Sequence, residues 1–201
     1  MNSSNPTAIL LAAGSSSRLG SPKQLLPWRG TTLLGYTLQQ INQSYIENII
    51  LVLGANAEKI ENTLDLARLR IVYNPAWETG KASSIQCGLS PIQEECSQVM
   101  FFLCDQPFLT SELINTVVHT AQTTNAEIIA PTVGEVIINP VLFKKKTFPA
   151  FHALKGDQGG KCLFDQFPMQ LVDWLDDRIL LDVDTCDDLK NLDQSSNSPL
   201  S

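Results

Sequence analysis

Residues 8–27 read AILLAAGSSSRLGSPKQLLP, and this stretch decides the fold class. It begins with a short apolar run, typical of a buried strand, and stops abruptly in small residues. Gly14 and the serines after it let the backbone come close to a ligand, and unpaired N–H groups in such a loop can hold an anion. Arg18 and Lys23 add two cations. The stretch therefore predicts a strand followed by a polyphosphate-binding loop; a serine-rich turn with solvated cations is the alternative.

Two common phosphate-binding motifs are absent from the sequence. The chain contains neither G-x-x-x-x-G-K-[ST] nor G-x-G-x-x-G. A P-loop kinase and a classical dinucleotide-binding dehydrogenase are therefore not the natural interpretations.

The composition is that of a globular protein without a nucleic-acid or membrane partner. The chain has 201 residues, 43% of them hydrophobic, and a net charge of −7, which argues against a general nucleic-acid binder. Its five cysteines form no C-x-x-C pair, which favours reduced thiols over disulfides or zinc. We see no signal peptide in the polar residues 1–7 and no apolar run long enough to cross a membrane. We expect a cytoplasmic protein.

Strands and helices alternate along the chain, which predicts a mostly parallel sheet with right-handed crossovers. The first expected strand begins at residue 8. Five more are expected over 49–53, 70–73, 99–103, 127–130 and 179–185. The expected helices run from a Thr31 or Thr32 cap to about Ser44, over 57–67, from a Thr110 or Ser111 cap, and over 186–192.

The stretch 74–89, NPAWETGKASSIQCGL, places two serines where a helix begins. Free N–H groups at such a helix start can hold a phosphate or a base edge. Ser83 and Ser84 are therefore candidate nucleotide contacts, with an ordinary capped helix as the alternative.

Asp105 follows the apolar strand over 99–103 and precedes Gln106 and Pro107. Ligands of parallel sheets bind at the carboxyl ends of strands, and Mg²⁺ is typically held by one or two carboxylates plus substrate phosphates. We expect Asp105 to hold Mg²⁺, rather than merely to cap a turn. Asp184, at the end of the last expected strand, is a candidate second ligand or a helix cap.

The motif L-A-A-G-x-S-x-R-x-G-x-x-K-x-L-L-P, which begins at Leu11, resembles the opening of the MobA-like nucleotidyltransferases. The molybdenum cofactor cytidylyltransferase branch is the most similar. Further blocks follow in the family's order: N-P-x-W-x-x-G-x-x-S-S-[IL]-x-x-G-L from residue 74, D-Q-P at 105–107, N-P-V-L-F at 139–143, L-x-G-D-x-G-A-R at 154–161 and D-[IV]-D-T-x-x-D-L from 182. In the block at 154–161, Gly160 and Lys161 replace the family's Ala and Arg.

The resemblance implies a Rossmann-like three-layer α/β/α nucleotidyltransferase fold with a mostly parallel central sheet. We expect one such domain over residues 1–193 and a disordered tail over 194–201. The implied reaction is attack of an acceptor phosphate on the α-phosphorus of an NTP, with release of pyrophosphate. Catalysis then rests on Arg18, Lys23 and Asp105, and Mg²⁺ is held by Asp105 and Asp184.

The resemblance also implies two sets of binding residues. The nucleotide would contact Leu11, Ala12, Ala13, Gly14, Ser15, Ser16, Ser17, Arg18, Lys23, Ser83, Ser84 and Asp105. The acceptor would contact Asn139, Pro140, Gly156, Asp157, Gly159 and Lys161; an ordinary surface turn is the alternative for 154–161.

CTP is favoured over GTP because Ala13 stands where guanylyltransferase relatives tend to carry a second glycine. The acceptor would be the molybdenum-pterin cofactor, which a molybdoenzyme then receives. Residues 135–138 depart from the family, because bulky Val and Ile replace a glycine-containing segment and would restrict close approach of the acceptor. Transfer from GTP or to a sugar phosphate, and a non-catalytic cofactor carrier, are the alternative functions.

Overall fold

The computed structural model describes residues 5–16, 21–65, 69–183 and 188, and its centre is a mixed sheet. The strand order is β10-β7-β9-β6-β1-β4-β5, with β8 paired to β7. All pairs are parallel except those of β8 and β9, which confirms the expected mostly parallel sheet. The strands are β1 (Thr7–Ala12), β4 (Asn48–Leu53), β5 (Arg70–Tyr73), β6 (Gln98–Leu103), β7 (Ile128–Val133), β8 (Val136–Ile137), β9 (Val141–Lys144) and β10 (Met169–Asp173), beside a small pair of β2 (Pro27–Trp28) and β3 (Thr31–Thr32).

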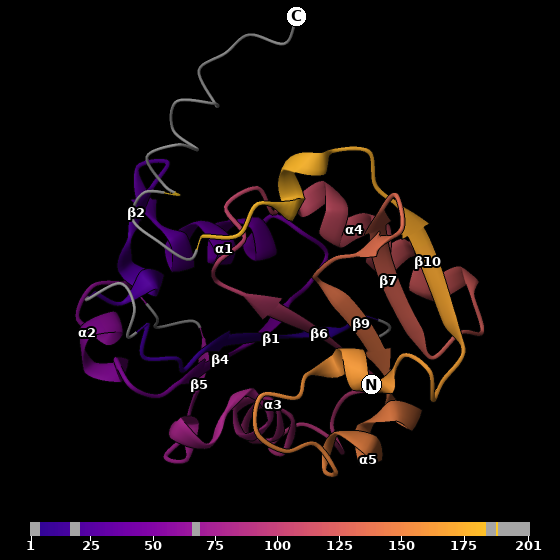
Figure 1. Cartoon of the computed structure of the whole chain (residues 1–201), viewed down its shortest axis with the longest axis horizontal. Helices are drawn as coiled ribbons and strands as arrows, with labels where there is room; N and C mark the ends of the chain where they lie inside the picture. The colour runs from indigo at the N-terminus through magenta and orange to yellow at the C-terminus, as the bar shows by residue number, and fades with distance from the viewer. Residues whose placement is uncertain (1–4, 17–20, 66–68, 184–187, 189–201) are drawn as a thin grey trace, which may run out of the picture.

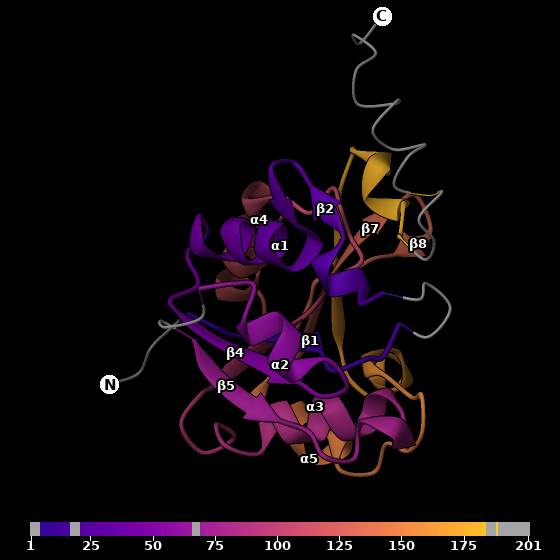
Figure 2. The same ribbon diagram turned by 90° about the vertical axis from the view of Figure 1, so that its left-hand side faces the viewer.

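Helices cover both faces of this sheet and make three layers (Figures 1 and 2). On one face lie α1 (Leu33–Asn42), α2 (Ala57–Glu61) and α4 (Ser111–Thr123), and on the other α3 (Lys81–Leu89) and α5 (Phe148–Phe151). Thr32 and Thr110 cap α1 and α4, as their sequence positions predict, by accepting hydrogen bonds from the N–H groups of Gly35 and Leu113.

The side chains of β1 alternate between the two hydrophobic layers. Ala8, Leu10 and Ala12 pack with the layer of α1 and α4, whereas Ile9, Leu11 and, just after the strand, Ala13 pack with the layer of α3. Helix α3 comes unusually close to this strand, because a Cβ on Gly88 would lie 2.6 Å from Cγ2 of Ile9. The last residues of β1 therefore point alternately toward and away from α3.

Two expected elements differ in the structure, and one strand was not expected. Helix α2 ends at Glu61 rather than near residue 67, because the next two residues, Asn62 and Thr63, are poor helix formers. The strand expected over 179–185 is wrong for its described part, because a short 3₁₀ helix, η6 (Asp177–Leu180), leads into residues 181–183 without regular structure. Strand β10 was not expected, since it lies at the sheet edge and its exposed Leu171 weakens the apolar pattern.

Two further expectations fall outside the described residues: the helix over 186–192, of which only residue 188 is described, and the tail over 194–201. No helix in the described ranges is both long and apolar enough to cross a membrane.

Candidate active site

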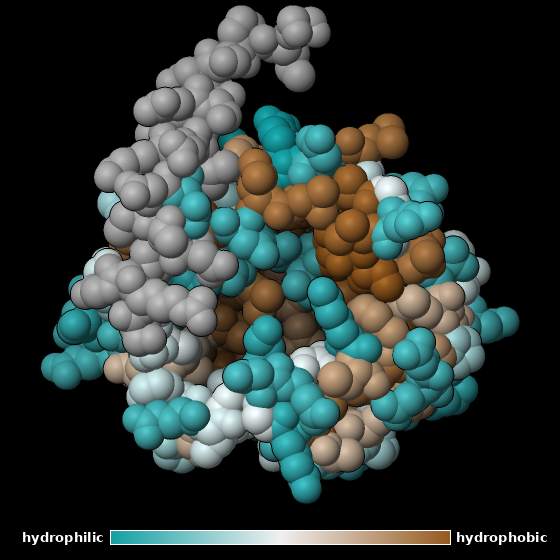
Figure 3. All heavy atoms as spheres, in the orientation of Figure 1, coloured by the Kyte–Doolittle hydropathy of each residue, from teal (hydrophilic) through white to brown (hydrophobic). Residues whose placement is uncertain are grey.

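A cavity of about 600 Å³ opens at the carboxyl ends of β1 and β6. Figure 3 shows the molecule hollowed near the centre of this face. The lining comes from four segments of the chain. They are the end of β1 and its loop (Leu11, Ala13, Gly14, Ser15, Ser16) with Lys23 and Gln24; the approach to α3 (Trp77, Glu78, Gly80, Lys81, Ser84); the end of β6 (Leu103, Cys104, Asp105); and Asp157.

The loop after β1 is held by bonds from several neighbours. The Ala55 N–H donates to the carbonyl of Ala13 at 3.0 Å, and the Lys23 N–H donates to Oγ of Ser16, also at 3.0 Å. Ser16 adopts the left-handed conformation, with φ 54°, which turns the chain sharply. The described residues 13–16 are therefore held at the cavity by bonds from both the loop after β4 and Lys23.

Lys23 and Asp105 form an ion pair inside the cavity. Nζ of Lys23 lies 2.8 Å from Oδ2 of Asp105, and both side chains are about one-fifth exposed, at 21% and 20%. The residues are 82 positions apart in sequence. Asp105 follows β6, which lies beside β1, and the bond from the Lys23 N–H to Ser16 holds Lys23 near the end of β1. The pair places a cation and an anion beside the loop after β1.

The carboxylate of Asp105 retains unused binding capacity. Its Oδ1 is buried and has no hydrogen-bond partner among the residues described here. A buried carboxylate oxygen without a donor is costly unless a cation or ligand satisfies it, so this side chain fits a divalent metal. Among the described residues, which do not include Asp184, His, Cys, Asp and Glu form no group of three able to hold a metal. Substrate phosphates and water are the usual further ligands of a Mg²⁺ held by one or two carboxylates.

Cys104, beside Asp105, does not supply a nucleophile. Burial, reinforced by the neighbouring Asp105 carboxylate, raises the pKa of its thiol to about 12. The thiol is neutral at physiological pH, and an unreactive thiol packs as a small apolar side chain.

Asn74 fixes the part of the cavity lining that is formed around the start of α3. This buried side chain donates through Nδ2 to Oγ of Ser83 at 2.9 Å and to Oγ of Ser84 at 3.0 Å. Its Oδ1 accepts from the N–H of Ala76 at 2.9 Å. Ser84 reaches the cavity, whereas Ser83 is not among the lining residues and its hydroxyl donates to backbone carbonyls.

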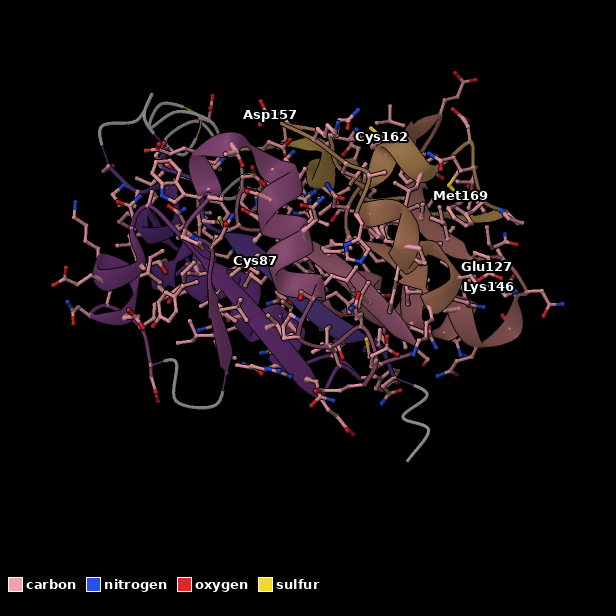
Figure 4. All side chains as sticks on the ribbon, turned by 90° about the horizontal axis from the view of Figure 1, so that it is seen from below. Cys87, Glu127, Lys146, Asp157, Cys162 and Met169 are labelled. Carbon is pink, nitrogen blue, oxygen red and sulfur yellow. The ribbon has the colours of Figure 1, made fainter. Side chains whose placement is uncertain are left out.

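The start of α3 is covered by the loop that follows Leu154, as Figure 4 shows for Asp157. The Ala82 N–H donates to the carbonyl of Gly156 at 2.9 Å, and the Lys81 N–H reaches Oδ1 of Asp157 at 3.4 Å. The Ser83 N–H donates to Gly80 at 3.3 Å. The expectation of free N–H groups at this helix start is therefore wrong, because another part of the chain already occupies them.

Gly80 allows this contact between the two loops. Its φ is 110°, and a Cβ there would lie 2.3 Å from the carbonyl carbon of Gly156. We expect Gly80→Ala to lower the free energy of unfolding by more than about 2 kcal/mol, combining backbone strain with the clash. Gly134→Ala is the matched control, because its φ of 58° carries strain but nothing lies within 4 Å. Equal losses in urea unfolding for both variants would contradict a tight contact at Gly80.

The structure brings many of the predicted site residues to one cavity. Leu11, Ala13, Gly14, Ser15, Ser16, Lys23, Ser84, Asp105 and Asp157 line it. Ala12 does not, because strand alternation turns it into the opposite core. Ser17, Arg18 and Asp184 fall outside the described residues. Asn139, Pro140, Gly156, Gly159 and Lys161 are described but are not among the lining residues.

Residues 135–138, whose bulky side chains depart from the family's sequence pattern, do not narrow the cavity. Val136 and Ile137 form β8, which pairs with β7 across a turn at Gly134, and none of the four residues lines the cavity. Sequence reasoning missed seven lining residues: Gln24, Trp77, Glu78, Gly80, Lys81, Leu103 and Cys104. The first five stand inside the quoted motifs, and the last two directly precede Asp105.

Comparison with known proteins gives one family and relatives with several different names. The model of the MobA-like NTP transferase domain matches residues 8–172. Nicotine blue oxidoreductase of Paenarthrobacter nicotinovorans is 29% identical over 195 residues, 92% of this chain and 95% of that protein. The probable molybdenum cofactor guanylyltransferase of Mycobacterium avium is 29% identical over 93% of this chain and 94% of its own length. The molybdenum cofactor cytidylyltransferase of Escherichia coli is 32% identical over 43% of this chain and 45% of its own length.

The fold also matches solved structures over nearly the whole chain. Rv0371c of Mycobacterium tuberculosis, solved in complex with manganese, has a TM-score of 0.78 and 28% identity, and the match covers 95% of this chain and 99% of that chain.

Proposed function

Because the chain belongs to the MobA-like NTP transferase family, we propose that this nucleotidyltransferase transfers CMP from CTP to the phosphate of the molybdenum-pterin cofactor. The observation that carries the proposal is the Lys23–Asp105 pair in the cavity beside the loop after β1. A cation, a carboxylate oxygen without a donor among the described residues, and the small residues 13–16 beside them together suit a triphosphate undergoing transfer.

The reaction joins two phosphates and needs little covalent chemistry from the protein. An oxygen of the acceptor phosphate forms a bond to the α-phosphorus of CTP, and the bond between that phosphorus and the pyrophosphate oxygen breaks. A phosphate nucleophile is already ionised at neutral pH, so positioning and charge neutralisation supply the catalysis. In the proposal, backbone donors of residues 13–17 hold the β- and γ-phosphates, Arg18 neutralises the departing pyrophosphate, and Lys23 contacts the α-phosphate or the acceptor phosphate.

Asp105 is the residue proposed to hold Mg²⁺, since its buried Oδ1 lacks a donor among the described residues. Asp184 is proposed as a second ligand. A bound Mg²⁺ would neutralise phosphate charge that builds up on transfer.

The choice of CTP over GTP rests on Ala13. Its side chain is 3% exposed, and a Cβ on Gly54 would lie only 2.9 Å from the Ala13 Cβ, so the methyl group lies tightly against the loop after β4. A methyl at this position reduces the room beside the base relative to a glycine, which favours the smaller pyrimidine. Relatives with cytidylyltransferase and guanylyltransferase names both occur, so the base is the part of the proposal to test first.

The acceptor is proposed to enter beside Asp157, which lines the cavity and lies in the segment 154–161. Asn139, Pro140, Gly156, Gly159 and Lys161 would complete its site, and a molybdoenzyme would receive the product. A sugar phosphate is the alternative acceptor.

Thermal unfolding with CTP, GTP, ATP and UTP, each with and without Mg²⁺, tests the nucleotide assignment. A ligand that binds only the folded protein adds about 2.7 kcal/mol of stability at a hundredfold over its Kd. We expect CTP with Mg²⁺ to give the largest increase in Tm. A larger increase with GTP would contradict the cytidylyl assignment, and no increase with any nucleotide would contradict nucleotidyl transfer and favour a carrier.

A further inference from the structure

Gln24 is a buried carboxamide that contacts both sides of the loop after β1. The residue is 2% exposed, and its Nε2 donates to the carbonyl oxygens of Ala12 at 3.0 Å and Gly14 at 2.8 Å. Its Oε1 accepts from Oγ of Ser16 at 3.4 Å. The same Ser16 oxygen accepts a hydrogen bond from the backbone N–H of Lys23. Gln24 is therefore linked through Ser16 to the backbone of Lys23, the lysine of the ion pair.

These bonds determine which way two peptide groups face. In a planar trans peptide, the carbonyl of one residue and the N–H of the next point in opposite directions. Because Gln24 holds the carbonyls of Ala12 and Gly14, the N–H groups of Ala13 and Ser15 point away from Gln24. Ala13 and Ser15 both line the cavity.

We propose that Gln24 is a positioning residue for nucleotide phosphates, acting through the peptide groups of this loop. The inference rests on the proposed binding of a nucleoside triphosphate at the loop. Without the carboxamide, the Gly14 carbonyl loses this donor and the peptide between Gly14 and Ser15 can rotate, whereas the pairing of Ala12 with Leu53 in the sheet still holds the peptide after Ala12. A rotated peptide presents a carbonyl oxygen where a donor stood, and that oxygen repels phosphate.

Loss of Gln24 should therefore weaken phosphate binding in particular. Gln24→Met keeps a similar length and removes both donors. We expect its Kd for CTP with Mg²⁺ to rise at least tenfold by titration calorimetry. The Kd for inorganic pyrophosphate should rise by a similar factor, whereas the Kd for CMP should change less than threefold.

Gln40→Met is the matched control. Oε1 of Gln40 accepts from the Ser111 N–H at 3.0 Å and joins α1 to the start of α4, outside the cavity. Its Tm should fall while the affinities for CTP and pyrophosphate stay within twofold of wild type. A general loss of stability is thus separated from a loss of phosphate binding.

The outcomes distinguish this inference from the proposed function. If the wild type binds CTP and Gln24→Met binds CTP and pyrophosphate within twofold of it, the role of Gln24 is overturned while the function stands. If the wild type binds no nucleoside triphosphate, the proposed function fails, and the inference with it. Should Gln24→Met fail to fold, Gln24→Asn, which keeps a shorter amide, is measured in the same way against the same limits.

Discussion

Replacing Asp105 with Asn should lower kcat at least a hundredfold while the fold persists. The change keeps the side chain's shape and removes its charge, so both the ion pair with Lys23 and the anionic Oδ1 are lost. Removing one group placed at developing charge typically costs 10² to 10³ in kcat. Pyrophosphate release with CTP and acceptor measures the effect, and titration with Mg²⁺ and Mn²⁺ should show a raised metal requirement.

A second lysine–carboxylate pair provides the control for Asp105→Asn. Oε1 of Glu127 lies 2.7 Å from Nζ of Lys146, and Figure 4 shows the two residues side by side, well away from Asp157. Glu127→Gln should therefore leave kcat unchanged, although it also breaks an ion pair. Full activity in Asp105→Asn, with the metal dependence of the wild type, would remove Asp105 from the catalytic assignment.

The part of the site that local pattern predicts well is the part built at strand ends. Asp105 and the loop after β1 each follow a buried apolar run, and parallel pairing of β1 with β6 necessarily brings their ends together. The same reasoning explains the one strand residue that was assigned to the nucleotide but faces the opposite core. This residue is Ala12, which strand alternation turns into the core opposite the cavity. The motif alone does not show that Leu11 and Gly14 reach the cavity while Ala12 does not.

Contacts between distant loops could not be predicted from local pattern. The docking of Gly156 on Gly80, which occupies the start of α3, joins segments more than seventy positions apart. Gly160 is a similar case: a Cβ there would lie 2.6 Å from Cζ of Phe143. The close approach of the Phe143 ring to Gly160 is likewise visible only in the packing.

Gln24 shows a different limit of sequence reasoning. It stands between Lys23 and an apolar pair in the opening motif, and its polarity alone suggests an exposed side chain. The structure buries it because the two carbonyls of the loop offer partners for both amide hydrogens. A buried polar residue of this kind is recognised only once the path of the loop is known.

Lys23→Met should have the other large effect and separate transition-state stabilisation from nucleotide binding. If the ammonium acts on the charge that develops at the α-phosphorus, kcat falls by about two to three orders of magnitude. The KM for CTP should rise much less, since the loop donors remain. Lys23→Arg keeps the charge with a different shape and should recover only part of the activity, because a planar guanidinium does not replace a compact ammonium.

The pairing of Lys23 with Asp105 makes a further demand on these measurements. Two groups that touch at 2.8 Å and act on the same reacting phosphate should not contribute independently. The double variant Lys23→Met with Asp105→Asn should therefore lose much less than the product of the single losses. Lys146→Met, which breaks the remote pair with Glu127, supplies the control and should leave kcat unchanged. Strictly multiplicative losses at Lys23 and Asp105 would show that the pair is not one catalytic unit.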